Sequence, residues 1–123
     1  MQFNFNSTEP IYLQVADQIE EAIFTQTFAE GEQIPSTTEI SKEFHINPAT
    51  VLKGMNILVD ASLIEKRRGV GMFVIAGAQA RIVEKRRDQF YTDYVKKLVS
   101  EAQKLHLTQE ELAKLIERGF SES

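Results

Sequence analysis

The sequence predicts a mainly α-helical chain with one small β-hairpin in 123 residues. Apolar residues recur at helical spacing in several stretches, and helix start signals precede four of them. Two short apolar runs flank the segment RRGVG, whose glycines permit a positive φ in a tight turn. A chain of this length favours one domain, or one small domain with an appendage.

The first predicted helix begins near Pro10, with Ser7 or Thr8 as its cap, because proline is well tolerated in a first turn. Its apolar stripe continues to about Phe28. The segment EGEQIP then ends the pattern, since its glycine and proline both disfavour helix.

Two more helices follow, separated by a short turn. Ser36 opens the second helix with a capping box, because Glu39 lies three residues further on. Asn47 caps the third helix and Pro48 occupies its first position. The expected ranges are 36–44 and 47–60. This close pair of short amphipathic helices is typical of a helix-turn-helix.

The apolar runs at 63–64 and 72–75 form the predicted hairpin, with Arg67 and Arg68 at its tip. A helix, a helix-turn-helix and a basic hairpin, in this order, are the layout of a winged helix. A long helix from about residue 79 and a final helix, capped by Thr108 and ended by Gly119, complete the chain. We therefore expect a winged helix-turn-helix domain at 1–77 and a two-helix tail at 78–123.

The net charge of −4 conceals a gradient along the chain. Residues 1–41 carry a net −7, residues 42–87 a net +5, and residues 88–123 a net −2. A basic central third is where an anionic partner would dock, although a chance fluctuation on a solvated surface also fits.

Several function classes lack their required residues. The chain has no cysteine, and its two histidines are far apart in the sequence, so we expect no metal site. No Gly-rich phosphate loop and no pair of a nucleophile with a base appears, so we expect neither an enzyme nor a cofactor. The first residues do not resemble a signal peptide, and no long apolar run occurs, so we expect a cytoplasmic protein without a membrane partner.

Four segments together resemble the GntR family of bacterial transcription regulators. They are PIYLQVADQI at 10–19, GEQIPS at 31–36, NPATV at 47–51 and LIEKRRGVGMFV at 63–74. The short tail resembles that of the smallest subgroup, the YtrA type. The resemblance implies a homodimer that binds an inverted-repeat operator in double-stranded DNA and usually represses. It also implies that the third helix reads the major groove while the hairpin lies along the minor groove or backbone.

Carried onto this sequence, the resemblance gives a set of candidate DNA contacts. These are Ser36, Thr38, Lys42, Asn47, Ala49, Thr50, Lys53, Arg67, Arg68 and Gly69. Thr38 and Lys53 stand where the family often has arginine, and Gly69 is a backbone requirement of the turn. Asn47 and Ser36 also fit a purely capping role, and Lys42 also fits a solvated surface. The run EKRRD at 84–88 fits either a solvated helix face or a phosphate contact.

In the tail, the apolar residues are candidates for dimerisation. These are Phe90, Tyr91, Tyr94, Val95, Leu98, Leu105, Leu112 and Leu115. An effector, a small molecule of unknown identity, is expected in an apolar cavity between two tails. The rival hypothesis is a winged-helix protein-interaction module that does not bind specific DNA, which the acidic N-terminal third and the neutral Thr38 favour.

Overall fold

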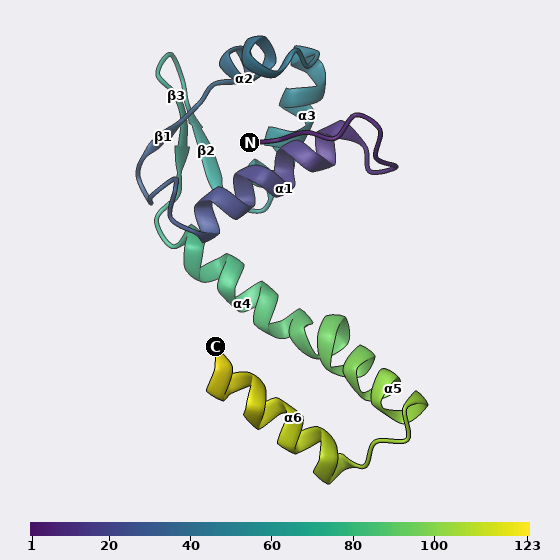
Figure 1. Ribbon diagram of the computed structural model, residues 1–123. Helices are drawn as coiled ribbons and strands as arrows, with labels where there is room; N and C mark the ends of the chain where they lie inside the picture. Colours follow the sequence, from purple (N-terminus) through teal and green to yellow (C-terminus); the bar gives the residue numbers. More distant parts are fainter. The chain divides into compact units, whose positions relative to one another are not determined.

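The computed structural model describes all residues from Met1 to Ser123 and confirms the mainly α-helical fold with a small sheet. Its elements, labelled in Figure 1, are α1 Ile11–Phe24, β1 Gln33–Ile34, α2 Thr37–Phe44, α3 Pro48–Asp60, β2 Ile64–Arg67, β3 Gly71–Val74, α4 Ala78–Phe90, the π-helical η1 Tyr91–Val95, α5 Lys96–Lys104 and α6 Gln109–Glu122. Two compact units divide the chain, Met1–Glu84 and Lys85–Ser123. None of the helices is long and apolar enough to span a bilayer.

The core of the first unit lies between α1, α2, α3 and the sheet. Its fully buried large side chains are Val15, Ile19, Ile23, Ile40, Val51, Met55, Ile64, Val74 and Ile82. Ala78 and Ile82 of α4 belong to this core, so the compact unit includes the first turns of α4 in addition to residues 1–77. Burial of these apolar groups is the main term that stabilises a domain of this size.

The start and end of α1 differ from the sequence prediction. Pro10 itself occupies the N-cap position, and no side chain caps the helix. The predicted cap at Ser7 or Thr8 is therefore wrong, and the Ser7 hydroxyl accepts a hydrogen bond from the Glu9 amide at 3.1 Å. The helix ends at Phe24 instead of Phe28, because Gln26 adopts a φ of +63°, which interrupts a helix.

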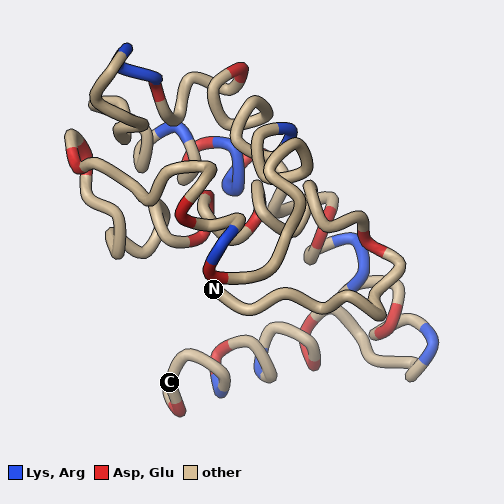
Figure 2. The backbone as a smooth tube through the Cα atoms, turned by 90° about the horizontal axis from the view of Figure 1, so that it is seen from above, with Lys and Arg blue, Asp and Glu red and all other residues tan.

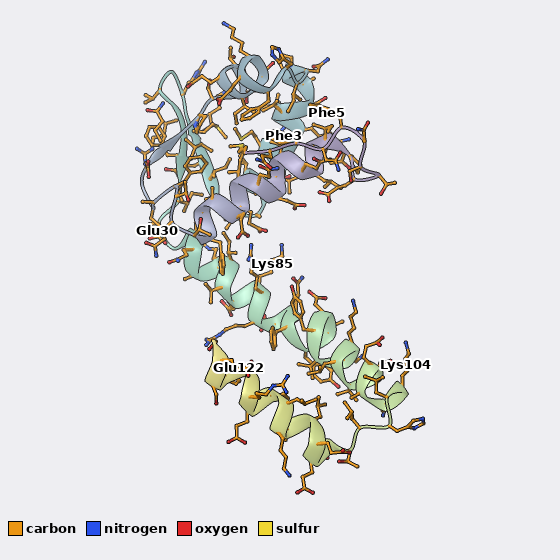
Figure 3. The ribbon with its side chains drawn as sticks, viewed as in Figure 1. Phe3, Phe5, Glu30, Lys85, Lys104 and Glu122 are labelled. Atoms are coloured by element: carbon orange, nitrogen blue, oxygen red, sulfur yellow. The ribbon has the colours of Figure 1, made fainter.

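The segment before α1 folds back along that helix. The Gln14 side chain accepts a hydrogen bond from the Asn4 amide at 2.9 Å and donates to the carbonyls of Asn4 and Glu9. Phe3 meets Phe44 of α2 edge to face, with ring centroids 4.9 Å apart. Phe3 and Phe5 are labelled on this segment in Figure 3. The N-terminal residues thus join α1 to α2.

The sheet has three strands in the order β1-β3-β2, all antiparallel. Sequence reasoning predicted the β2–β3 hairpin, which we call the wing, but missed β1. In the wing, Arg67 pairs with Gly71, so the turn comprises Arg68, Gly69 and Val70. Gly69 has a φ of +76°, which explains the need for glycine there.

In the second unit, α5 and α6 are joined by a turn in which His106 has a φ of +57°. Thr108 caps α6 through the predicted capping box, and its amide and hydroxyl hold the pKa of the Glu111 carboxyl below its usual value. The helix continues through Gly119 to Glu122, so the prediction that Gly119 ends it is wrong. A glycine inside a helix weakens it without breaking it.

Candidate nucleic-acid interface

The turn between α2 and α3 is fixed by local hydrogen bonds. His45 closes α2 in the left-handed conformation, at a φ of +56°. The Ser41 hydroxyl donates to the Ile46 carbonyl at 2.6 Å, and the Ile46 side chain is buried in the core. A short turn with a buried apolar residue sets the angle between the two helices, as a helix-turn-helix requires.

Both helices begin with a side-chain cap, as the sequence predicted. The Ser36 hydroxyl accepts from the Glu39 amide at 3.0 Å, and the Asn47 Oδ1 accepts from the Ala49 amide at 2.8 Å. These contacts establish a capping role for Ser36 and Asn47. Thr38, Lys42, Asn47, Ala49 and Lys53 are exposed, and Ser36 and Thr50 are half-buried. The candidate contacts on α2 and α3 therefore include polar atoms that an incoming partner can reach.

Lys53 has a partner that the sequence analysis missed. Its Nζ lies 4.0 Å from the centroid of the Tyr12 ring on α1, a cation–π geometry. Gly54, the next residue on α3, lies close to the backbone of Tyr12, so a Cβ there would collide with the Tyr12 carbonyl oxygen. The start of α1 and the middle of α3 are thus closely packed, and the Lys53 side chain lies against the Tyr12 ring at this contact.

The two arginines of the wing have different surroundings. Arg67 forms an ion pair with Glu65 at 3.2 Å and lies over the Phe73 ring at 4.0 Å. Residues two apart on a strand share a face, and Phe73 is the cross-strand partner of Glu65, so all three side chains meet on one face. The spacing of Glu65 and Arg67, two residues apart on one strand, is the signal that could have revealed this ion pair from the sequence. Arg68, in the turn, has no ion-pair partner in the structure.

The charged residues are spread along the backbone. Figure 2 shows Lys and Arg in short separate segments among Asp and Glu. The candidate cations accordingly fall into two sets, Lys42 and Lys53 on the helix pair and Arg67 and Arg68 on the wing. No group of three His, Cys, Asp or Glu side chains is arranged to hold a metal ion.

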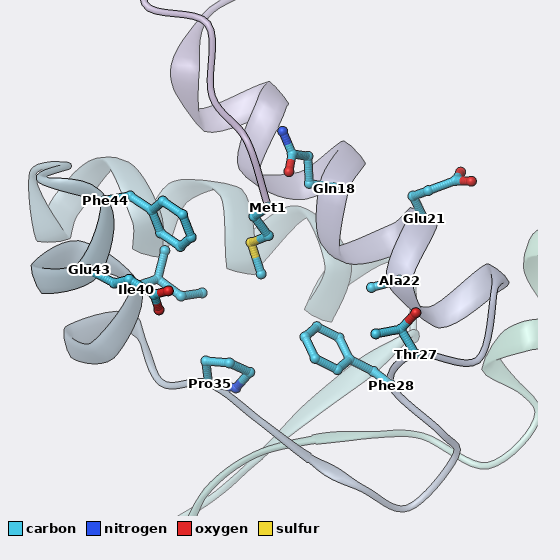
Figure 4. Close-up of a pocket in the computed structure, with 10 residues that line it drawn as sticks. All are labelled: Met1, Gln18, Glu21, Ala22, Thr27, Phe28, Pro35, Ile40, Glu43 and Phe44. Atoms are coloured by element: carbon cyan, nitrogen blue, oxygen red, sulfur yellow. The ribbon is translucent and has the colours of Figure 1, made fainter.

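A groove of about 530 Å³ lies elsewhere on the first unit. Figure 4 shows its lining, which comes from the N-terminal residue, α1, α2 and the chain between the two helices and includes Met1, Phe28, Ile40 and Phe44. None of the candidate DNA contacts lines this groove. Most of the candidate contacts are exposed side chains on α2, α3 and the wing, which suits the insertion of a helix or wing into a nucleic-acid groove.

In the second unit most large apolar side chains are exposed. Ala102 is its one buried hydrophobic residue. Among the dimerisation candidates, the exposed ones are Phe90, Tyr91, Tyr94, Leu98, Leu105 and Leu115, while Val95 and Leu112 are half-buried. Sequence reasoning did not single out Phe120, which is 80% exposed. Side chains of α5 and α6, including Val99, Leu112 and Ile116, line an apolar groove of about 550 Å³.

Comparison with known proteins places these features in a family. Residues 11–74 match the family described as bacterial regulatory proteins, gntR family. The HTH-type transcriptional repressor YtrA of Bacillus subtilis is 30% identical over 117 residues, which cover 95% of this chain and 87% of YtrA. The match includes the tail, so the similarity extends beyond the winged helix.

Two solved structures agree with this assignment. A structure described as a GntR-family transcriptional regulator from Bacteroides thetaiotaomicron is 29% identical, with a TM-score of 0.72 over 91% of this chain and 97% of the other. The DNA-binding domain of AraR, solved in complex with operator ORE1, is 28% identical, with a TM-score of 0.53 over 60% of this chain and 93% of the other. The chain therefore belongs to the GntR family, and it is a DNA-binding helix-turn-helix transcriptional regulator and not an enzyme.

Proposed function

We propose that the chain is a homodimeric repressor of the bacterial cytoplasm that binds an inverted-repeat operator and is released by a small-molecule effector. The observation that carries the proposal is the uncovered apolar surface of the second unit, where six dimerisation candidates are exposed and Ala102 alone is buried. Apolar patches of this kind on a small unit favour association. A second copy of the chain would cover the same residues on both partners.

The first unit supplies the contacts with DNA in this proposal. The first turn of α3, with Asn47, Ala49 and Thr50, enters the major groove, where the positive end of the helix dipole favours phosphate. Arg68 at the tip of the wing reaches a phosphate or the minor groove, where the potential is most negative. The operator complex of the AraR domain supports DNA binding by the first unit, and the description of YtrA as a repressor supports the proposed repression.

The effector is proposed to bind at the tail. The groove between α5 and α6 is lined mostly by apolar side chains, as small-molecule sites usually are. A ligand that changes how two tails pair would change the spacing of the two α3 helices, which must meet major grooves about 34–36 Å apart. Operator affinity would then fall.

Selection of bound DNA from a randomised duplex pool tests this proposal, followed by titration of the selected sequence against salt. An enriched inverted repeat is expected, with log K falling by about 0.9 for each neutralised phosphate per unit of log salt. No enrichment, with weak and salt-labile binding alone, would contradict the operator-binding proposal and favour the protein-interaction module.

A further inference from the structure

Gln33 of β1 makes a hydrogen bond with the turn of the wing. Its side-chain Nε2 donates to the carbonyl of Val70 at 2.9 Å. Gln33 itself is exposed, and β1 pairs with β3 on the side opposite to β2. The strand that sequence reasoning missed therefore contacts the segment that carries Arg68.

The backbone of β1 cannot make this contact. Gln33 pairs with Phe73 and Ile34 pairs with Met72, so the same antiparallel register would place Pro35 opposite Gly71. The next residue, Ser36, would lie opposite Val70 in that register, but its amide donates to the Glu39 carboxylate at 3.3 Å in the capping box of α2. The side-chain amide of Gln33 supplies a donor to the wing beyond the last backbone pair.

Gly71 leaves the space that this contact needs. Its φ of +144° lies in the region that favours glycine, and a Cβ at this position would collide with the Gln33 Nε2. The hydrogen bond thus depends on both residues, one as the donor and the other through its missing side chain.

We propose that Gln33 is a positioning residue for DNA binding, which acts by holding the wing turn in the conformation that presents Arg68. The inference rests on the proposed contact between Arg68 and DNA. A turn that is already ordered in the free protein loses less conformational entropy on binding, so preordering raises affinity. Gln33 itself touches no DNA in this account.

The substitution Gln33→Met tests the role, because methionine has a similar length and no charge but cannot donate a hydrogen bond. Loss of one hydrogen bond to a neutral acceptor predicts a weakening of operator binding by about 2- to 10-fold. Because Gln33 is exposed, we expect Tm to change by less than about 4 °C. Amide hydrogen exchange in the free protein should become faster at Val70.

A double-mutant cycle separates positioning from a direct or general effect. Gln33→Met should weaken operator binding in the wild-type background and have almost no further effect when Arg68→Ala is present. In the matched cycle, Gln33→Met and Lys53→Ala should act additively, since Lys53 lies on α3 and not on the wing. Equal losses from Gln33→Met with and without Arg68 would overturn the inference.

The two proposals fail in different ways. If Arg68→Ala leaves operator affinity unchanged, the proposed wing contact is wrong and this inference is wrong with it. If Arg68→Ala weakens binding while Gln33→Met does not, the proposed contact between Arg68 and DNA stands. Only the proposed positioning role of Gln33 is then excluded. Unchanged hydrogen exchange at Val70 in the Gln33→Met protein would also exclude it.

Discussion

The ammonium of Lys53 lies 4.0 Å from the centre of the Tyr12 ring, which links α3 to the start of α1. Lysine has a flexible stem and no geometric preference comparable to the arginine fork. Contact with the ring therefore restricts the conformations of the Lys53 side chain, which its flexible stem alone would not do. This contact suggests how a lysine can serve at a position where the family often has arginine.

Replacement of Tyr12 tests the role of this ring. Tyr12→Phe keeps the π face and should change operator affinity by less than about twofold, whereas Tyr12→Leu removes it and should weaken binding about two- to fivefold, as expected for an exposed cation–π contact. Fluorescence anisotropy with operator duplexes measures both. Equal behaviour of the two variants would show that the ring does not position Lys53.

Gly54→Ala should destabilise the first unit. Alanine gains about 1 kcal/mol of helix propensity over glycine. The added Cβ would meet the Tyr12 carbonyl and the Val15 side chain at under 3 Å, and overpacking costs about 1–3 kcal/mol. Because backbone cannot move aside as a flexible side chain can, we expect the packing cost to exceed the propensity gain. Urea denaturation would measure this, and a more stable variant would contradict the expectation.

Substitutions at Ser36 separate its observed cap from its proposed DNA contact. Ser36→Ala should lower stability by about 1 kcal/mol, through loss of the bond from the Glu39 amide. Ser36→Asp restores a cap of similar strength but places a carboxylate near phosphate, so it should fold normally and bind DNA more weakly. Operator affinity equal to wild type in the aspartate variant would leave Ser36 as a cap alone.

Glu65 should restrain DNA binding, because it pairs with Arg67. Removal of this charge in Glu65→Gln should strengthen operator binding and steepen the salt dependence, by up to about 0.9 in the log–log slope if Arg67 then reaches a phosphate.

Arg68→Ala should lower the log–log slope of binding against salt by about the same amount for operator and random DNA alike. An unchanged slope in both proteins would show that the wing makes no phosphate contact.

The sequence predicted the elements whose signals are local. Ser36, Asn47 and Thr108 cap their helices as expected, since a capping side chain and the amide it accepts from are only a few residues apart. The same reasoning failed at Ser7 and Thr8, because Pro10 takes the cap position. A cap motif thus locates a helix end well only when no competing residue follows it.

The features that the sequence did not predict depend on distant partners. The two-residue strand β1 has no periodicity of its own and exists because β3 pairs with it. The contact of Tyr12 with Lys53 joins positions that are 41 residues apart in the chain, and Gln33 meets Val70 only once the sheet has formed. Such contacts follow from tertiary packing, which no local pattern encodes.

A comparison of the full inverted repeat with a single half-site would test most directly whether the tail joins two DNA readers. The intact protein should bind the full repeat at least about 100-fold more tightly than the half-site, because the second contact is intramolecular. Leu105→Glu, at a side chain that is 69% exposed, should give a monomer in analytical ultracentrifugation that binds both duplexes alike. Ser100→Glu adds the same charge at a polar position and should behave as wild type. Equal affinity of the intact protein for the half-site and the full repeat would contradict the dimeric reader.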